Sequence, residues 1–197
     1  LFQAVKAVST EAEARGIEPD KITKGLGLEQ MAVPDIYEDP VTMAANAAQK
    51  LFDKGLDKKQ IGRLVVATET GVDASKPTSD YVHELLGLPN DVESYEYKHA
   101  CVAGTYALLD ALNWIQAGQN EGKSALIICT DIARYELKSP GEATQGAGAV
   151  AMLVSEYPKL LDLYPNKGTY TQNVKDFWRP HNRDCAFVDG HFSNECY

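Results

Sequence analysis

The chain has 197 residues, of which 44% are hydrophobic and 24% charged, and its formal net charge is −9. That is enough apolar sequence for one sizeable core, and the acidic balance excludes a surface built for nucleic acid or anionic membrane. No apolar run of about 18 residues and no signal-peptide pattern occur, so we expect no membrane partner. The four cysteines are too few and too scattered for a disulfide framework, which favours a reducing, cytoplasmic location.

The beginning of the chain predicts a helix, because apolar residues recur from Phe2 to Ala12. Residues 21–33 are predicted to be irregular or short-helical. Since the helical pattern is already under way at Leu1 and no terminating signal precedes Tyr197, we expect the sequence to be a fragment.

The first strong element is a helix that begins at Asp39 and Pro40, an N-cap carboxylate followed by proline, and runs to Gly55. Residues 63–68 then form a continuous apolar run, typical of a strand buried on both faces of a parallel sheet. Glu69 follows directly, where open α/β sheets collect ligands. A solvated loop carboxylate is the simpler interpretation. However, the small, uncharged neighbours of Glu69 predict poor solvation, a raised pKa and a general base.

A loop, a helix over residues 78–86 that stops at Gly87, and a short strand over residues 94–97 lead to Cys101. From Cys101 onward an apolar stripe predicts a long helix that ends near Gly118; the stripe consists of Cys101, Thr105, Leu108, Leu112 and Ile115. Cys101 is therefore expected in the first residues of this helix, where free N–H groups and the helix dipole favour a thiolate. The alternative is a buried cysteine that packs as a small hydrophobe.

A second buried strand over residues 125–130 ends in Asp131 and completes a βαβ unit, with Cys129 expected in the core. Residues 146–154 predict a strand interrupted by glycines, which we expect to admit a backbone or a ligand closely. Because Gly146 and Gly148 open a strand and not a helix, a nucleotide-binding loop is not expected.

Two histidines and two cysteines near the end of the chain raise the question of zinc: His181, Cys185, His191 and Cys196. Their order lacks the paired Cys-x2-Cys knuckle of structural zinc sites, so we expect free thiols and no metal.

Six motifs, taken together and in order, resemble 3-hydroxy-3-methylglutaryl-CoA synthase of the bacterial type over almost the whole chain. They are Ala67-Thr68-Glu69, Ala100-Cys101 with Thr105, residues 130–135, residues 141–149, residues 176–180 and Asp189-Gly190.

The resemblance implies an α/β, thiolase-like fold with layered αβαβα architecture. Residues 1–197 would form the N-terminal half-domain with the nucleophilic cysteine, and the C-terminal half would be absent. Cys101 would take the acetyl group from acetyl-CoA, and Glu69 would act as general acid/base in the condensation with acetoacetyl-CoA. The product belongs to the mevalonate pathway of isoprenoid biosynthesis.

The resemblance also assigns Asp131, Tyr135, Phe177, Thr105 and Gly146 to substrate binding. It implies a homodimer of the full-length protein, CoA thioesters as small-molecule partners, and no cofactor or metal.

Two positions depart from the family: His99 stands where relatives usually carry glutamate, and Val102 where an aromatic residue often follows the cysteine. The family's catalytic histidine would lie beyond Tyr197, and no histidine of this chain matches it.

Three alternatives remain open. One is a β-branching synthase that acts on carrier-protein thioesters. Another is an initiating ketoacyl synthase, which Glu69 disfavours because that enzyme needs no such base. The third is an inactive half-domain that only associates with a partner.

Overall fold

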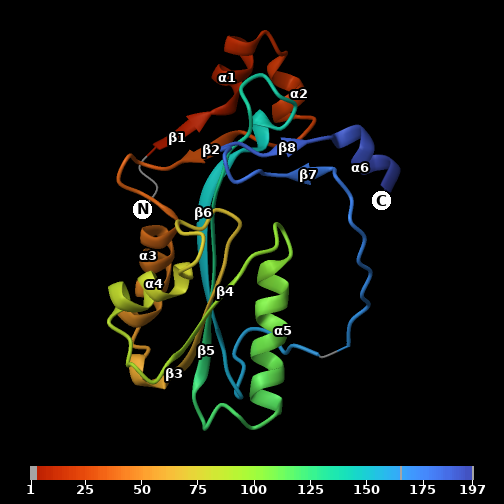
Figure 1. The fold of residues 1–197 in the computed structure, drawn as a ribbon. Helices are drawn as coiled ribbons and strands as arrows, with labels where there is room; N and C mark the ends of the chain where they lie inside the picture. The colour runs from red at the N-terminus through yellow and green to blue at the C-terminus, as the bar shows by residue number, and fades with distance from the viewer. Residues whose placement is uncertain (1–3, 165, 197) are drawn as a thin grey trace. The chain divides into compact units, whose positions relative to one another are not determined.

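The structure is a computed structural model that describes residues 4–164 and 166–196. The chain divides into two compact units, which are described separately. Within the described residues, the first contains 38–131, 148–164 and 166–167, and the second contains 4–37, 132–147 and 168–196. The elements are β1 Ala4–Ala7, α1 Val8–Arg15, α2 Pro19–Thr23, β2 Gln30–Val33, α3 Pro40–Asp53, β3 Ile61–Ala67, α4 Thr78–Leu86, β4 Glu93–Tyr97, α5 Ala103–Gln116, β5 Ser124–Ala133, β6 Gly146–Val154, β7 Phe177–Trp178, β8 Phe187–Val188 and α6 Gly190–Cys196 (Figure 1).

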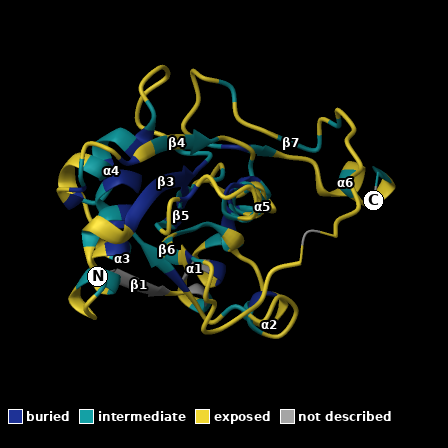
Figure 2. Cartoon of the chain, turned by 90° about the horizontal axis from the view of Figure 1, so that it is seen from below, coloured by how far each residue is buried: buried dark blue, intermediate teal, exposed yellow. Residues whose placement is uncertain are grey.

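A sheet with the strand order β4-β3-β5-β6 organises the first unit. β3 is parallel to both of its neighbours, and every one of its residues is buried. Figure 1 and Figure 2 show α3 and α4 on one face of this sheet and α5 on the other. The predicted βαβ unit is confirmed, because α5 crosses from β4 to β5.

Local signals fix the helices on the first face. The Asp39 side chain accepts a hydrogen bond from the Thr42 backbone N–H at 2.7 Å, and the Thr42 hydroxyl accepts one from the Asp39 N–H at 2.9 Å. This capping box starts α3 where the sequence predicts it. α4 ends at Gly87, whose φ of 56° is the left-handed conformation that glycine adopts at little cost.

The two faces of β5 serve two different cores. Leu126 and Ile128 pack on the α3 and α4 side, whereas Ala125 and Ile127 pack on the α5 side. α5 buries a stripe of mostly small residues against this second side: Ala103, Ala107, Ala111 and Trp114. The predicted stripe was therefore wrong by about one residue. Alanines bring the helix close to the sheet, and the larger Leu108 and Ile115 pack only at the edge of the cluster.

One buried cation fastens α5 to the sheet. Arg63 of β3 is 8% exposed and forms salt bridges with Glu93 of β4, at 2.6 Å, and with Asp110 of α5, at 2.8 Å. Its guanidinium also lies 4.7 Å from the centre of the Trp114 ring. Because it pairs with two carboxylates, its charge is compensated where solvent is scarce.

The start of the second unit is a strand and not the helix that the sequence predicts. The first described residues, Ala4–Ala7, form a strand that pairs antiparallel with β2, and only from Val8 does the chain become helical. Phe2 lies outside the described residues. Arg15 of α1 forms a bidentate pair with Glu142, which is 4% exposed, and this pairing lowers the pKa of the Glu142 carboxyl. Pairing with a distant strand has overridden the local helical pattern.

Candidate active site

Two turns carry the residues that the sequence singled out, and each follows a parallel strand of the first unit. Thr68 to Thr70 follow β3, and the Cys101 turn follows β4. Both turns therefore lie at the carboxyl edge of the sheet, where α/β folds bind ligands. Asp131 was expected just after β5, but the strand continues to Ala133, so Asp131 is a strand residue.

The Asp131 carboxylate organises the Glu69 turn. Its Oδ1 accepts hydrogen bonds from the backbone N–H of Glu69 at 2.8 Å and of Thr70 at 3.1 Å. The same oxygen accepts the hydroxyl hydrogens of Thr68 and Thr70, both at 2.9 Å. Four donors on one carboxylate oxygen fix the backbone of the turn, so Asp131 acts on Glu69 by orienting its main chain.

The Cys101 turn is held differently. Cys101 has a left-handed backbone with φ of 57°, and it lies two residues before the start of α5 at Ala103. The His99 carbonyl closes the turn by accepting the N–H of Val102 at 3.2 Å and of Ala103 at 2.8 Å. The strand-to-helix turn is confirmed, but the nucleophile candidate precedes the helix and does not lie in its first residues.

The electrostatics of Cys101 correct a second expectation. Desolvation, first, and then the negative charges of Glu69 and Asp131 raise the pKa of the Cys101 thiol. The sequence predicted the opposite, because it showed the helix terminus but not the two carboxylates. Although Cys101 is an exposed residue, its sulfur is predominantly a thiol at neutral pH. Because the Glu69 turn and the Cys101 turn follow neighbouring parallel strands, the negative charge of Glu69 acts on the thiol from the same edge of the sheet.

Gly104 lies where the first turn of α5 packs directly against β5. A Cβ on this residue would lie 2.6 Å from the Cys129 Sγ, closer than real side chains come. Cys129 is half-buried on the face of β5 that packs against α5, and burial raises the pKa of its thiol. The expected core role of Cys129 thus includes contact with the first turn of α5. Thr105, one residue further on, is exposed.

Three of the residues assigned to substrate binding belong to the second unit. The rings of Tyr135 and Phe177 meet edge to face at 6.4 Å, and a Cβ on Gly141 would lie 2.9 Å from the Tyr135 ring. A Cβ on Gly146 would meet only the Ala32 carbonyl, at an ordinary 3.7 Å, and one on Gly148 would meet nothing within 4 Å. We expected Gly146 and Gly148 to admit a neighbouring backbone or a ligand closely. The part of this expectation that concerns a backbone was wrong.

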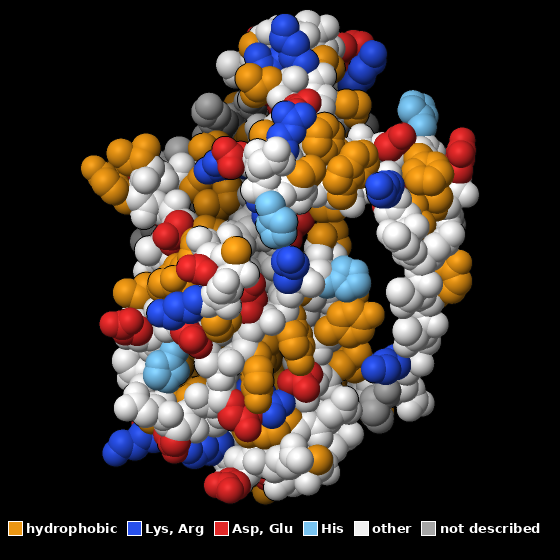
Figure 3. Space-filling model, viewed as in Figure 1, with side chains coloured by type: hydrophobic (Ala, Val, Ile, Leu, Met, Phe, Trp, Pro, Cys, Tyr) orange, Lys and Arg blue, Asp and Glu red, His pale blue; other side chains and the backbone are white. Residues whose placement is uncertain are grey.

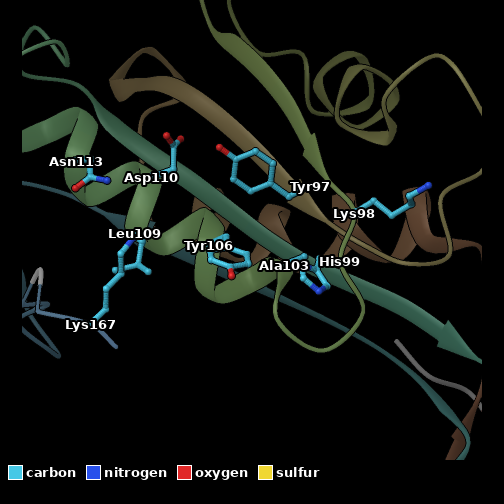
Figure 4. A pocket seen from close by; sticks show the side chains of 9 residues that line it. All are labelled: Tyr97, Lys98, His99, Ala103, Tyr106, Leu109, Asp110, Asn113 and Lys167. Atoms are coloured by element: carbon cyan, nitrogen blue, oxygen red, sulfur yellow. The ribbon is translucent and has the colours of Figure 1, made fainter. Parts of the chain in front are cut away.

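A pocket of about 370 Å³ lies beside the Cys101 turn, and the sequence did not point to it. It is lined by Tyr97, Lys98, His99, Ala103, Tyr106, Leu109, Asp110, Asn113 and Lys167 (Figure 4). The Tyr97 hydroxyl donates a hydrogen bond to the Asp110 carboxylate. Burial, and then the negative charge of Asp110, raise the pKa of Tyr97. His99 and Tyr106 face each other with ring centres 5.8 Å apart, and Figure 3 shows histidine and hydrophobic side chains at the surface over α5. Cys101, Glu69 and Asp131 do not line this pocket.

Among residues 4–164 and 166–196, no three histidine, cysteine or acidic side chains come together as metal ligands. Cys185 and Cys196, considered for zinc from their spacing, are free thiols. None of the helices in the described part of the chain is long and apolar enough to cross a membrane.

Comparison with known proteins gives consistent results. Residues 2–158 match the family described as hydroxymethylglutaryl-coenzyme A synthase N terminal. The hydroxymethylglutaryl-CoA synthase of Haloferax volcanii is 50% identical over 195 residues, which cover 96% of this chain and 44% of that protein.

Two solved structures extend the comparison to the fold. MvaS in complex with 3-hydroxy-3-methylglutaryl coenzyme A superposes with a TM-score of 0.93 at 49% identity, covering 98% of this chain and 46% of that one. The curacin-pathway HMG synthase in complex with an acetyl donor-ACP gives 0.85 at 33% identity, covering 98% and 48%. The expected α/β, thiolase-like fold is confirmed. The chain spans about half the length of the relatives it matches.

Proposed function

Because the chain belongs to the hydroxymethylglutaryl-CoA synthase family, we propose that the whole protein joins acetyl-CoA to acetoacetyl-CoA, with Cys101 as the nucleophile and Glu69 as the base. The observation that carries this proposal is that Glu69 and Cys101 lie in turns that follow the neighbouring parallel strands β3 and β4 at the carboxyl edge of the sheet, with the Glu69 charge acting on the Cys101 thiol. Formation of the thioester requires a thiol as nucleophile, and removal of a proton from its methyl group requires a base such as a nearby carboxylate.

The proposed reaction has three steps. The Cys101 sulfur attacks the acetyl carbonyl of acetyl-CoA, and the thiol proton ends on the departing CoA sulfur. Glu69 then removes a methyl proton from the acetyl-enzyme, and the resulting carbanion attacks the ketone carbon of acetoacetyl-CoA. The electron pair of the C=O bond moves to the ketone oxygen, which takes up a proton and becomes the 3-hydroxyl group. Water finally cleaves the thioester to Cys101, which frees 3-hydroxy-3-methylglutaryl-CoA. The acetyl group is transferred from CoA to Cys101 and is then joined to acetoacetyl-CoA through a new carbon–carbon bond. The proposed activity of the full-length protein is therefore that of an acyltransferase.

The other assigned residues support this chemistry in different ways. Asp131 fixes the turn that carries Glu69, as its four hydrogen bonds indicate. For Tyr135, Phe177, Thr105 and Gly146, contact with the CoA thioesters remains a prediction from the family resemblance. Residues 1–197 are proposed to be the N-terminal half of the catalytic domain, since relatives are about twice as long.

The experiment separates the two chemical steps in the full-length protein. Incubation with acetyl-CoA should add one acetyl group to Cys101, and Cys101→Ser should abolish both labelling and turnover. Glu69→Ala should leave acetyl transfer intact but slow condensation by about 10² to 10⁴, the usual contribution of a general base. Labelling of Cys129 instead of Cys101 would remove the nucleophile assignment, and equal losses in both steps would remove the base assignment.

A carrier-protein thioester is the second candidate substrate, because the curacin-pathway synthase was solved with an acetyl donor-ACP. The higher identity to MvaS, 49% against 33%, favours CoA. Acetylation of Cys101 by acetyl-CoA and by an acetylated carrier protein, compared at equal concentration, distinguishes the two substrates. A marked preference for the carrier protein would overturn the CoA assignment.

The full-length protein is further proposed to be a cytoplasmic homodimer. β4 is an edge strand in the described sheet, so its outer edge presents backbone groups that a second copy can pair with. The four free cysteines fit a reducing compartment. Sedimentation of the full-length protein tests the dimer, and a monomer at micromolar concentration would contradict it.

A further inference from the structure

The start of α5 and the middle of β5 are in direct contact at Gly104 and Cys129. A methyl group on Gly104 would come within 2.6 Å of the Cys129 Sγ, about 1 Å closer than van der Waals contact allows. The sulfur therefore occupies the space that a side chain at position 104 would need. Because Ala125 and Ile127 contact α5 from the same face of β5, Cys129 continues a packed row toward the Cys101 turn.

β5 thus supports both turns of the site. Two residues after Cys129, Asp131 holds the backbone of the Glu69 turn. Cys129 in turn meets α5 three residues after Cys101 and one residue after the first residue of the helix. The two turns are therefore connected through residues 129–131, which are consecutive residues of strand β5.

We infer that Cys129 is a positioning residue for the proposed reaction, and that its contact with Gly104 sets how close Cys101 lies to Glu69. This inference builds on the proposed function, in which those two groups act in succession on the acetyl unit. The Cys129 sulfur does not react. Its size determines how deeply the first turn of α5 sits on the sheet.

The contact predicts a specific pattern of rescue in the full-length protein. On this inference the packed Cys129 sulfur does not yield, so Gly104→Ala is expected to push the start of α5 outward, and a displacement of about 1 Å is sufficient to slow a positioned reaction about 100-fold. Cys129→Ala alone removes one sulfur atom and should slow acetylation only a few-fold. The double variant regains the space for the new methyl group, so its acetylation rate should return to within about tenfold of the original.

A second readout does not depend on acetyl-CoA. The rate at which iodoacetamide alkylates Cys101, followed by peptide mass across a pH series, reports the pKa of its thiol. Gly104→Ala should move the midpoint toward that of an ordinary thiol, because the sulfur leaves the neighbourhood of Glu69 and Asp131, and the double variant should restore it. A merely destabilising substitution would change the melting temperature without moving this midpoint.

The outcomes separate the two proposals. If wild-type Cys101 is not acetylated but the alkylation midpoint still shifts and recovers, the proposed function fails and the positioning role stands. If the double variant behaves as Gly104→Ala does in both readouts, the positioning role is wrong. Gly168→Ala is the matched control, because a Cβ there meets no atom within 4 Å, and it should change neither readout.

Discussion

The turn that carries Glu69 and the turn that carries Cys101 occupy equivalent places after neighbouring strands, yet they are held by different forces. Asp131 provides a charged acceptor for two N–H groups and two hydroxyls of the Glu69 turn. The Cys101 turn has backbone hydrogen bonds to the carbonyls of His99 and Ala100, and it contains a residue in the left-handed conformation. One turn is fixed by its own polar contacts, whereas the other depends on the packing of the helix that follows it.

This difference suits the two proposed roles. A general base must keep its position while the acetyl group and the second substrate come and go, and a carboxylate with four donors gives it that rigidity. A nucleophile must project from the backbone toward its substrate, and the left-handed turn before α5 leaves Cys101 exposed. The contacts of α5, through Arg63 at Asp110 in its middle and through Gly104 in its first turn, then locate the exposed turn.

The largest effect should come from removing the support of the Glu69 turn. Asp131→Ala deletes the acceptor of four hydrogen bonds, and hydrogen bonds to charged groups contribute about 1.5–3 kcal/mol each in mutational series. Because such contributions are not additive, we expect a loss of about 3 kcal/mol in the free energy of unfolding. Condensation by the full-length variant should fall at least 100-fold, with acetylation of Cys101 less affected.

Denaturant unfolding and the two separate assays measure these effects. Asp131→Asn is the matched control, because an amide oxygen can still accept from the same donors while the charge is lost. It should recover most of the stability. If Asp131→Ala unfolds at the same denaturant concentration as the original protein, the four bonds do not hold the turn.

The sequence predicted the elements whose signals are local. Asp39 with Pro40 located the start of α3, Gly87 the end of α4, and the apolar run before Glu69 the central strand. These predictions succeeded because a cap, a left-handed glycine and a doubly buried strand each have a distinctive short pattern. The same patterns placed Glu69 and Cys101 directly after strands, and in the structure these strands are the neighbours β3 and β4.

The errors involve contacts between distant residues. β1 was read as a helix because its partner strand lies more than twenty positions along the chain, and the packed stripe of α5 was missed because alanines carry a weak apolar signal. The pKa of Cys101 was predicted to fall, since no sequence pattern shows that desolvation and the charges of Glu69 and Asp131 act on its thiol. The tertiary structure determines which charged side chains lie near one another, and the spacing of residues along the sequence does not reveal it.

An intermediate effect should separate charge from geometry at Cys101. Desolvation and the charges of Glu69 and Asp131 together raise the pKa of the thiol above the ordinary value of about 8.5. Glu69→Gln removes one negative charge with little change in shape. The thiolate then becomes easier to form, so the midpoint of Cys101 alkylation by iodoacetamide should move to lower pH while remaining above the ordinary value because of burial.

Glu84→Gln, a change of the same type at an exposed position on α4, is the control and should leave the midpoint unchanged. Peptide mass analysis across the pH series distinguishes Cys101 from the other three cysteines. A midpoint that rises in Glu69→Gln, or one that does not move, would show that the carboxylate does not act on the thiol.

The smallest effect concerns the backbone of Cys101 itself. A side chain in the left-handed region costs about 1 kcal/mol or more, whereas glycine adopts it freely but loses about 0.4–1 kcal/mol through the greater freedom of the unfolded chain. Replacing Cys101 by glycine should therefore give a protein as stable as, or about 0.5 kcal/mol more stable than, Cys101→Ala.

The same comparison inside a helix has the opposite sign, so Ala47→Gly in α3 should cost about 1 kcal/mol. Denaturant midpoints of the three variants measure the difference. If glycine at position 101 were as costly as at position 47, the turn would not be strained. If glycine costs less at position 101 than at position 47, the Cys101 turn keeps a residue that weakens the fold, as expected when side-chain chemistry and not stability determines that residue.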